Sequence, residues 1–216
     1  PLSYYETNVT GTLNVLEAAR KSDKLKKFVY AASSSCYGIP EVFPTPETAE
    51  IKPEYPYALT KRLGEECVLH WGKVYSLPVV SLRFFNVYGP RARNNNTYGA
   101  VVKVFLAQKL NDSPLTIVGD GEQKRDFIFI DDVVRAVYSA ATSDVFGECI
   151  NIGAGNPKSV NQLVGMISDK KVHIPKRPGE PDITWADITK ARQFLEWEPK
   201  ISLEEGVKIM LDNIEY

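Results

Sequence analysis

The sequence predicts an α/β fold built on a parallel sheet with crossover helices. Helical and strand-like patterns alternate through the first 85 residues, in the order helix, strand, helix, strand. The strand-like patterns are short apolar runs, which are typical of strands covered on both faces. With 216 residues and a hydrophobic content of 44%, the chain can bury one large core or two small ones.

The first predicted helix covers residues 3–22. Val9, Leu13, Leu16 and Ala19 share one helical stripe, and basic side chains gather at the C-terminal end, where the helix dipole favours them. The elements that follow are a buried strand at 28–32, a loop rich in Pro and Glu at 38–56, a helix at 57–75 and a strand at 79–85.

The character of the chain changes after residue 90. The polar stretch 91–98 is expected to be a loop, and Asp131 or Asp132 is expected to cap the helix after the strand at 127–130. The other predicted elements are helices at 100–110, 159–169, 187–195 and 203–214, strands at 115–118 and 148–152, a turn at 119–121 and a Pro-rich connection at 175–181.

Composition argues against several classes of protein. Lys and Arg total 26 and Asp and Glu total 27, so no basic field is available to bind nucleic acid or a membrane surface. No window approaches the run of about 18 apolar residues that a transmembrane helix needs. The three cysteines lack a CxxC spacing, which predicts reduced thiols and a cytoplasmic location. His70 and His173 have no ligand-like partners, so no metal site is expected.

Tyr57 and Lys61 stand four residues apart near the start of a predicted helix, which places them on one face. One interpretation is a chance pair on an exposed surface. The other is a general acid/base, because a nearby ammonium lowers the pKa of a phenol from about 10 towards neutrality. The pair alone does not decide between them.

Ser33, Ser34 and Ser35 follow the strand at 28–32 directly. Ligands of open parallel sheets bind outside the carboxyl ends of the strands, so a hydroxyl there can hydrogen-bond a substrate oxygen. The alternative is an ordinary polar strand end. The serines combined with the Tyr-x-x-x-Lys spacing are more specific than either feature alone.

Ser33, Tyr57 and Lys61 resemble the catalytic triad of extended short-chain dehydrogenases/reductases. Further segments resemble successive signatures of the nucleotide-sugar epimerases and dehydratases in that family, over essentially the whole chain. These segments are TNVTGTLNVLEAAR (7–20), FVYAASSSCYG (28–38), SLRFFNVYGPR (81–91), GDGEQKRDFIFIDDV (119–133) and NIGAG (151–155).

The resemblance implies the C-terminal part of a doubly wound, Rossmann-like domain and a small α/β substrate-binding domain. Residues 1–90 and 127–155 would belong to the NAD-binding domain, and 91–126 and 156–216 to the substrate-binding domain. The family's glycine-rich NAD fingerprint has no match here, and the chain starts at Pro1. We therefore expect about 90 residues, the first third of a family member, to be absent.

The resemblance also indicates the reaction. Sugar 4,6-dehydratases carry Asp-Glu after the catalytic serine and UDP-glucuronate decarboxylases carry Glu, whereas this chain has Ser34 and Ser35. That pattern is similar to 4-epimerases, which need only a hydride and one proton. The expected cofactor is NAD and the expected substrate is a UDP-sugar, epimerised at C4 through a 4-keto intermediate.

Individual site residues can be carried over by position. Asn8, Ala31 and Phe84, together with the triad, match cofactor-binding positions. The positions that match substrate contacts are Ser34 and Ser35, Asn86, Arg125 and Arg177 for the diphosphate, Glu180 for the nucleotide ribose, and Thr184 beside the sugar C2 substituent.

Thr184 bears on specificity, because a tyrosine at this position restricts related 4-epimerases to plain hexoses. The small Thr184, with Ala100 in place of an asparagine, resembles enzymes that accept UDP-N-acetylglucosamine. Two alternatives stay open: a UDP-glucuronate 4-epimerase, or a non-catalytic module that binds nucleotide sugars. The family usually dimerises through two helices, here 3–22 and 57–75, so a homodimer is expected.

Overall fold

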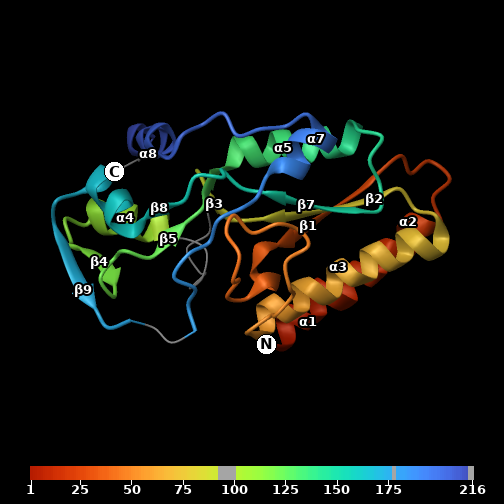
Figure 1. Ribbon diagram of the computed structural model, residues 1–216, viewed down its shortest axis with the longest axis horizontal. Helices are drawn as coiled ribbons and strands as arrows, with labels where there is room; N and C mark the ends of the chain where they lie inside the picture. The colour runs from red at the N-terminus through yellow and green to blue at the C-terminus, as the bar shows by residue number, and fades with distance from the viewer. Residues whose placement is uncertain (92–100, 177–178, 214–216) are drawn as a thin grey trace.

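In the computed structural model, which describes residues 1–91, 101–176 and 179–213, three parallel strands form the central sheet (Figure 1). They are β1 (Phe28–Ser33), β2 (Val79–Phe84) and β7 (Glu148–Ile152), in the order β1-β2-β7. Ser33 pairs with Phe84, and Phe84 pairs with Ile152, so the carboxyl ends of the strands form one row. The predicted parallel α/β fold is confirmed.

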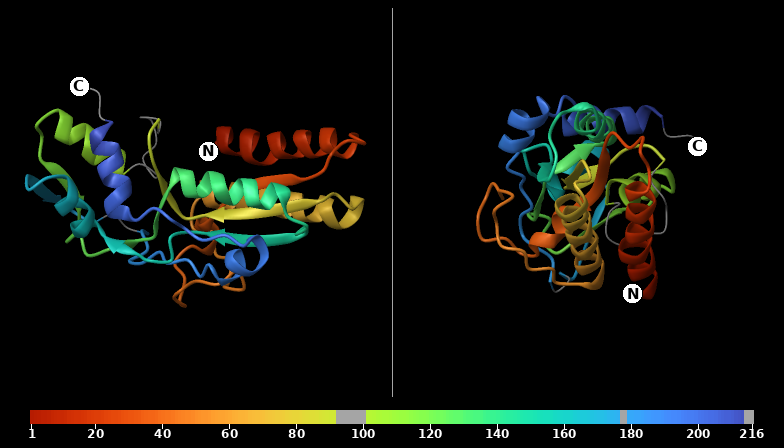
Figure 2. Two further views of the ribbon diagram at one scale, coloured as in Figure 1. Left: turned by 90° about the horizontal axis from the view of Figure 1, so that it is seen from above. Right: turned by 90° about the vertical axis from the view of Figure 1, so that its right-hand side faces the viewer.

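Helices cover both faces of this sheet (Figures 1 and 2). One face carries α3 (Pro56–Tyr75) and a continuous helix made of α1 (Leu2–Tyr5), the π-helical segment η1 (Glu6–Gly11) and α2 (Thr12–Arg20). The other face carries α5 (Ile130–Thr142) and α7 (Thr189–Leu195). Side chains alternate along β2: Val79 packs in the core under α2 and α3, whereas Val80 and Leu82 pack in the opposite core.

Short strands and three helices form a second group at the other end of the molecule (Figure 1). Its core includes Phe105, Leu115, Leu163 and Val207. The strands are β3 (Asn86–Tyr88) paired with β6 (Phe127–Phe129), β4 (Leu115–Val118) with β9 (Lys171–Ile174), and β5 (Lys124–Arg125) with β8 (Lys158–Ser159). The helices are α4 (Val101–Leu110), α6 (Val160–Ile167) and α8 (Leu203–Asp212).

The expected division into a cofactor-binding and a substrate-binding domain stays a prediction. Ala191 and Leu195 of α7 pack into the core of the three-stranded sheet, although the expected division assigns them to the substrate-binding part. Among the helices that the structure describes, none has both the length and the apolar character needed to cross a bilayer.

The expected cap of α5 is wrong. Phe129 is the N-cap residue and makes no side-chain cap, while Asp131 and Asp132 lie in the first turn. Asp132 is fully buried, and its carboxylate accepts hydrogen bonds from the backbone N–H groups of Lys200 and Ile201 instead. Its side chain therefore ties α5 to the segment before α8.

The predicted and observed elements also differ at their ends. Strands β3, β5, β8 and β9 are two to four residues long and include polar residues, so they lack the apolar runs that reveal β4 and β6. Parts of four predicted segments lie outside the described residues. They are the loop 91–98, the first residue of the helix 100–110, the connection 175–181 and the end of the helix 203–214.

A buried ion pair joins α3 to the sheet. Arg83 and Glu65 are 3% and 1% exposed, and Arg83 Nη2 lies 2.9 Å from Glu65 Oε2. Ser81 also donates to Glu65, over 2.8 Å, and Arg83 Nη1 donates to the hydroxyl of Tyr37, which donates to Asn151. Burial opposes ionisation of Glu65, but the hydrogen bonds from Arg83 outweigh it and lower the pKa of this carboxyl.

Replacing Glu65 by Gln should therefore leave a buried guanidinium without its counter-charge. We expect Glu65→Gln to lower the free energy of unfolding by about 3 kcal/mol in urea titrations. Glu66→Gln is the matched control, because Glu66 is exposed and its pair with Arg62 should contribute less than about 1 kcal/mol. Equal losses in the two variants would contradict the importance of the buried pair.

Candidate active site

Ser33 is the last residue of β1 and the N-cap of the short 3₁₀ helix Ser34–Tyr37. Its hydroxyl oxygen accepts hydrogen bonds from the backbone N–H of Ser35 over 3.2 Å and from the hydroxyl of Ser35 over 2.9 Å. All three serines are half-buried. The strand end thus presents a hydroxyl that two neighbouring donors hold in place.

Tyr57 lies in the first turn of α3, which begins at Pro56, a residue suited to this position because its missing N–H costs no helical hydrogen bond. Its ring meets the ring of Tyr4 edge-on at 5.6 Å between centroids. Burial raises the pKa of the Tyr57 phenol, hydrogen bonding with Ser33 partly offsets that rise, and Tyr4 adds to it. Tyr57 and Ser33 are therefore neighbours, as the sequence predicts.

Lys61 lies one helical turn after Tyr57, and its side chain reaches β1, the strand that ends in Ser33. Its ammonium donates to the backbone carbonyl of Ala31 over 2.6 Å and lies 5.2 Å from the centre of the Tyr30 ring. Burial lowers the pKa of Lys61. The structure thus brings Ala31, Ser33, Tyr57 and Lys61 together at one end of β1.

The expected lowering of the Tyr57 pKa by Lys61 is not what this chain shows. The net shift of the phenol is upward, because the loss of hydration on burial is the largest influence on it. The ammonium of Lys61 donates instead to the carbonyl of Ala31. A phenolate at Tyr57 would need additional positive charge nearby.

The other two residues carried over for the cofactor lie beside this cluster. Asn8, in the π-helical segment, donates from its side chain to the hydroxyl of Thr60 over 3.0 Å, and Thr60 donates to the carbonyl of Tyr57. Phe84 is half-buried and pairs with Ser33 across the sheet. Both residues are therefore fixed to elements that carry the Ser/Tyr/Lys cluster.

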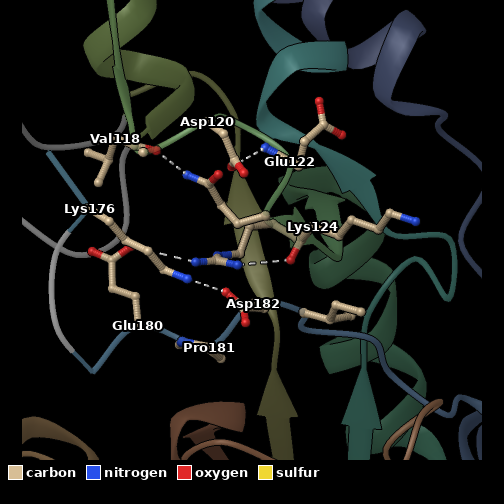
Figure 3. A pocket seen from close by; sticks show the side chains of 12 residues that line it. Val118, Asp120, Glu122, Lys124, Lys176, Glu180, Pro181 and Asp182 are labelled. Atoms are coloured by element: carbon tan, nitrogen blue, oxygen red, sulfur yellow. Dashed lines mark hydrogen bonds and ion pairs between the residues drawn. The ribbon is translucent and has the colours of Figure 1, made fainter. Parts of the chain in front are cut away.

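A second cluster lines a cavity of about 480 Å³ between β4, β5, Lys176 and the segment at 180–183 (Figure 3). Arg125 is 13% exposed in its side chain, and its Nη2 lies 3.6 Å from Glu180 Oε2. Lys176 and Asp182 form an ion pair at 2.6 Å on the cavity wall. Arg177 and Ala100, which the sequence analysis singled out, lie outside the described residues.

Asn86 and Thr184 belong to the same end of the molecule. Asn86 begins β3, two residues after Phe84, and its backbone N–H donates to the carbonyl of Asp126 over 3.0 Å. The Thr184 hydroxyl donates to the side-chain oxygen of Asn86 over 2.8 Å. Both residues therefore lie beyond the carboxyl ends of β1 and β2 and are hydrogen-bonded to the backbone on either side of Arg125.

Asp126 organises this second cluster, and the sequence analysis missed it. The side chain is fully buried, and its carboxylate accepts backbone hydrogen bonds from Ala154, Gly155 and Ala186 over 2.6, 3.1 and 2.8 Å. Burial raises the pKa of Asp126 to about 6, against the effect of these three donors. The available signal was a lone acid at the start of the apolar run Phe127–Ile130.

Lys124, Lys176 and Asp182 were missed as well, although all three line the cavity (Figure 3). Little in the sequence indicates that these residues belong to a site, because charged residues near predicted loops are usually solvated. Their proximity to Arg125 depends on the fold. The backbone N–H of Lys124 donates to the carbonyl of Asp182, and Lys124 pairs with Ile183 in a β-bridge.

A parallel sheet with helices on both faces, carrying Ser, Tyr and Lys at the carboxyl end of a strand, defines an extended short-chain dehydrogenase/reductase. Residues 1–210 match the family model described as GDP-mannose 4,6 dehydratase, and the chain belongs to that family. The chain spans 65% of the length of curated relatives that it matches.

Similar proteins include several 4-epimerases. A putative UDP-glucose 4-epimerase of Methanocaldococcus jannaschii is 37% identical, with coverage of 94% of this chain and 67% of the relative. A UDP-N-acetylglucosamine 4-epimerase from Methanobrevibacter ruminantium M1, solved with UDP-N-acetylmuramic acid, is 32% identical with a TM-score of 0.90, covering 99% and 72%. A UDP-glucuronic acid 4-epimerase from Bacillus cereus, solved with UDP-glucuronic acid and NAD, is 38% identical with a TM-score of 0.85, covering 96% and 67%.

Asp126→Asn should destabilise the protein, because one amide oxygen cannot accept from three N–H donors. We expect a loss of about 2 kcal/mol in urea unfolding. The folded pKa of about 6 lies above the unfolded value of about 3.9, so the folded state binds more protons between these values. The contribution of this carboxyl to stability is therefore fully present below about pH 4 and is lost as the pH rises through about 6.

The difference in stability between the wild-type protein and Asp126→Asn should consequently be larger at pH 4 than at pH 7. Urea titrations across that range measure it, with Asp131→Asn in the first turn of α5 as a control. A difference that grows towards pH 7 would show that the three N–H donors lower the folded pKa and would refute the assignment.

Proposed function

We propose that the protein containing this chain is an NAD-dependent 4-epimerase of UDP-sugars. The proposed substrates are UDP-glucose and UDP-galactose, and also UDP-N-acetylglucosamine and UDP-N-acetylgalactosamine. The observation that carries the proposal is the cluster of Ser33, Tyr57 and Lys61 at the carboxyl end of β1. The epimerases among the similar proteins support the same reaction class.

The residues at the end of β1 fit the nicotinamide half of NAD. Ala31 is exposed on β1, Phe84 ends the neighbouring strand, and the ammonium of Lys61 can donate to ribose hydroxyls. The sequence contains no glycine-rich fingerprint for the adenosine half. The proposal therefore gives this chain only the nicotinamide side of the cofactor site.

In the proposed mechanism Tyr57 takes the proton from the sugar 4-hydroxyl. Ser33 hydrogen-bonds that hydroxyl and can relay the proton, since it already interacts with Tyr57. Lys61 and the positively charged nicotinamide of bound NAD would together favour the ionised form of the phenol, because burial opposes it in this chain. Bound NAD would supply reversible hydride transfer at the sugar C4, and Tyr57 would return the proton to the C4 oxygen.

The nucleotide must stay anchored while the sugar ring turns over, so its binding groups lie away from the reacting carbon. We assign the diphosphate to Asn86 and Arg125, with Arg177 as a further expected contact, and the nucleotide ribose to Glu180. The low exposure of Arg125 and its place at the cavity of about 480 Å³ support this assignment. A planar guanidinium suits phosphate oxygens.

Ser34 and Ser35 favour epimerisation over elimination or decarboxylation. Both are half-buried next to Ser33, and neither supplies the carboxylate that those reactions require. A UDP-glucuronate 4-epimerase is the second candidate, which the similarity to the Bacillus cereus enzyme supports. Comparing turnover of UDP-glucuronate with that of UDP-glucose in the intact protein distinguishes the two.

A non-catalytic module that binds nucleotide sugars is the remaining alternative, and NAD retained by the purified intact protein would exclude it.

We also propose a homodimer through the helices at 3–22 and 57–75. Exposed apolar side chains on these helices support it: Leu2, Val15, Leu59, Val74 and Tyr75. The proposed cytoplasmic location is supported by three cysteines that are all free.

Tyr57→Phe should nearly abolish epimerisation in the intact protein, because it removes the group that takes the proton. We expect kcat to fall by at least about a hundredfold with KM little changed. Interconversion of UDP-glucose and UDP-galactose is the assay, and Tyr138→Phe, on an exposed tyrosine of α5, is the control. Wild-type turnover by Tyr57→Phe would rule out the proposed mechanism.

Thr184→Tyr should discriminate between substrates, because a bulky ring would occupy the space proposed for the N-acetyl group. We expect the ratio of kcat/KM for UDP-N-acetylglucosamine over UDP-glucose to fall by at least about tenfold. Thr184→Val, which is close to threonine in volume, should leave that ratio unchanged. A ratio that is the same in Thr184→Tyr and Thr184→Val would exclude the gating role.

A further inference from the structure

The Thr184 hydroxyl is held between a backbone donor and a side-chain acceptor from two other segments. Its oxygen lies 2.8 Å from Asn86 Oδ1, and it accepts the backbone N–H of Asp126 over 3.1 Å. The backbone of the same three segments is also joined, since Asn86 N–H donates to Asp126 and Thr184 N–H donates to Lys124. The position of this hydroxyl is therefore fixed by main-chain geometry.

This arrangement determines which way the Asn86 amide faces. A threonine hydroxyl has a single proton to donate, and the side-chain oxygen of Asn86 is its acceptor among the described residues. With the amide reversed, the hydroxyl would accept from both Asp126 and Asn86 and its own proton would be left unpaired. The carbonyl oxygen of Asn86 therefore faces Thr184, and its NH₂ group faces away.

The NH₂ group of Asn86 makes no hydrogen bond within the part of the chain that the structure describes. Its backbone lies against Asp126, the residue that follows Arg125. Asn86 begins β3, which pairs with β6, and Arg125 ends β5, which directly precedes Asp126 and β6 in the chain. Two groups that can only donate, an amide NH₂ and a guanidinium, thus belong to segments that meet at Asp126. Such a set of donors suits the oxygens of a diphosphate.

We propose that Thr184 is a positioning residue for the nucleotide diphosphate: its hydroxyl holds the Asn86 amide with the NH₂ group turned towards the diphosphate oxygens. This inference rests on the proposed function, because it takes the diphosphate as the ligand of Asn86. It gives the hydroxyl of Thr184 a role separate from the size of its side chain. Loss of the hydroxyl should weaken the binding of every nucleoside diphosphate equally, whatever sugar the nucleotide carries.

Calorimetric titration of the intact protein with UDP and with UMP tests the proposal without any turnover. Thr184→Val keeps the shape of the side chain but releases the Asn86 amide. We expect it to weaken UDP binding by about tenfold and UMP binding by less than about threefold, because UMP lacks the second phosphate. Thr184→Ser retains the hydroxyl and should restore most of the lost affinity.

A double-mutant cycle shows whether Thr184 acts through Asn86. Asn86→Ala should weaken UDP binding at least as much as Thr184→Val, and the double variant should be no weaker than Asn86→Ala alone. Thr142→Val is the matched control, because its hydroxyl bonds to the backbone at the exposed end of α5. If Thr184 had a purely structural role, Thr184→Val would weaken the binding of UDP and of UMP alike. Its effect on UDP affinity would also add to that of Asn86→Ala.

The outcomes separate this inference from the proposed function. If the wild-type protein binds neither UDP nor UMP, both fail. If the wild-type protein binds UDP but Asn86→Ala or Thr184→Val leaves the UDP affinity unchanged, the positioning role is refuted and the proposed function stands. The same holds if the losses of UDP affinity in the two variants add. Selective loss of UDP affinity with rescue by Thr184→Ser supports it.

Discussion

Parallel pairing of β1 with β2 is the constraint on which both parts of the candidate site depend. Because Ser33 is paired with Phe84, the strand that ends in serines and the strand that leads to Asn86 finish at the same edge of the sheet. Tyr57 and Lys61 reach that edge from α3, which packs on both strands. A shift of one residue in this register would reverse every side chain of β1 and separate the Ser/Tyr/Lys cluster.

Two buried acids hold this arrangement through different kinds of partner. Glu65 is compensated by the guanidinium of Arg83 and fixes α3 against β2. Asp126 accepts from three backbone N–H groups and fixes the loop after β7 and the segment at 184–186. Charged groups without such partners are costly inside a protein, so each acid specifies the position of its neighbours closely.

Much of the fold could be predicted from the sequence, because its long elements carry strong periodic patterns. The strands of the central sheet and the helix at 57–75 were predicted within a residue or two. The two-residue strands and the role of Asp132 could not be, since they depend on contacts with residues far away in the chain. In the site, motif resemblance identified Ser33, Tyr57 and Lys61 as candidates, but residue types alone could not show that burial raises the pKa of Tyr57.

Tyr57, Lys61 and Glu65 follow one another at intervals of four residues on α3, so one helical stripe carries both the candidate acid/base pair and the acid that anchors the helix. Turning or sliding α3 to adjust the first two would displace the third from Arg83. Evolution therefore has little freedom to retune chemistry on this helix. Divergence in substrate choice within such a scaffold should accumulate instead in side chains such as that of Thr184, which can change without disturbing the pair of Arg83 and Glu65.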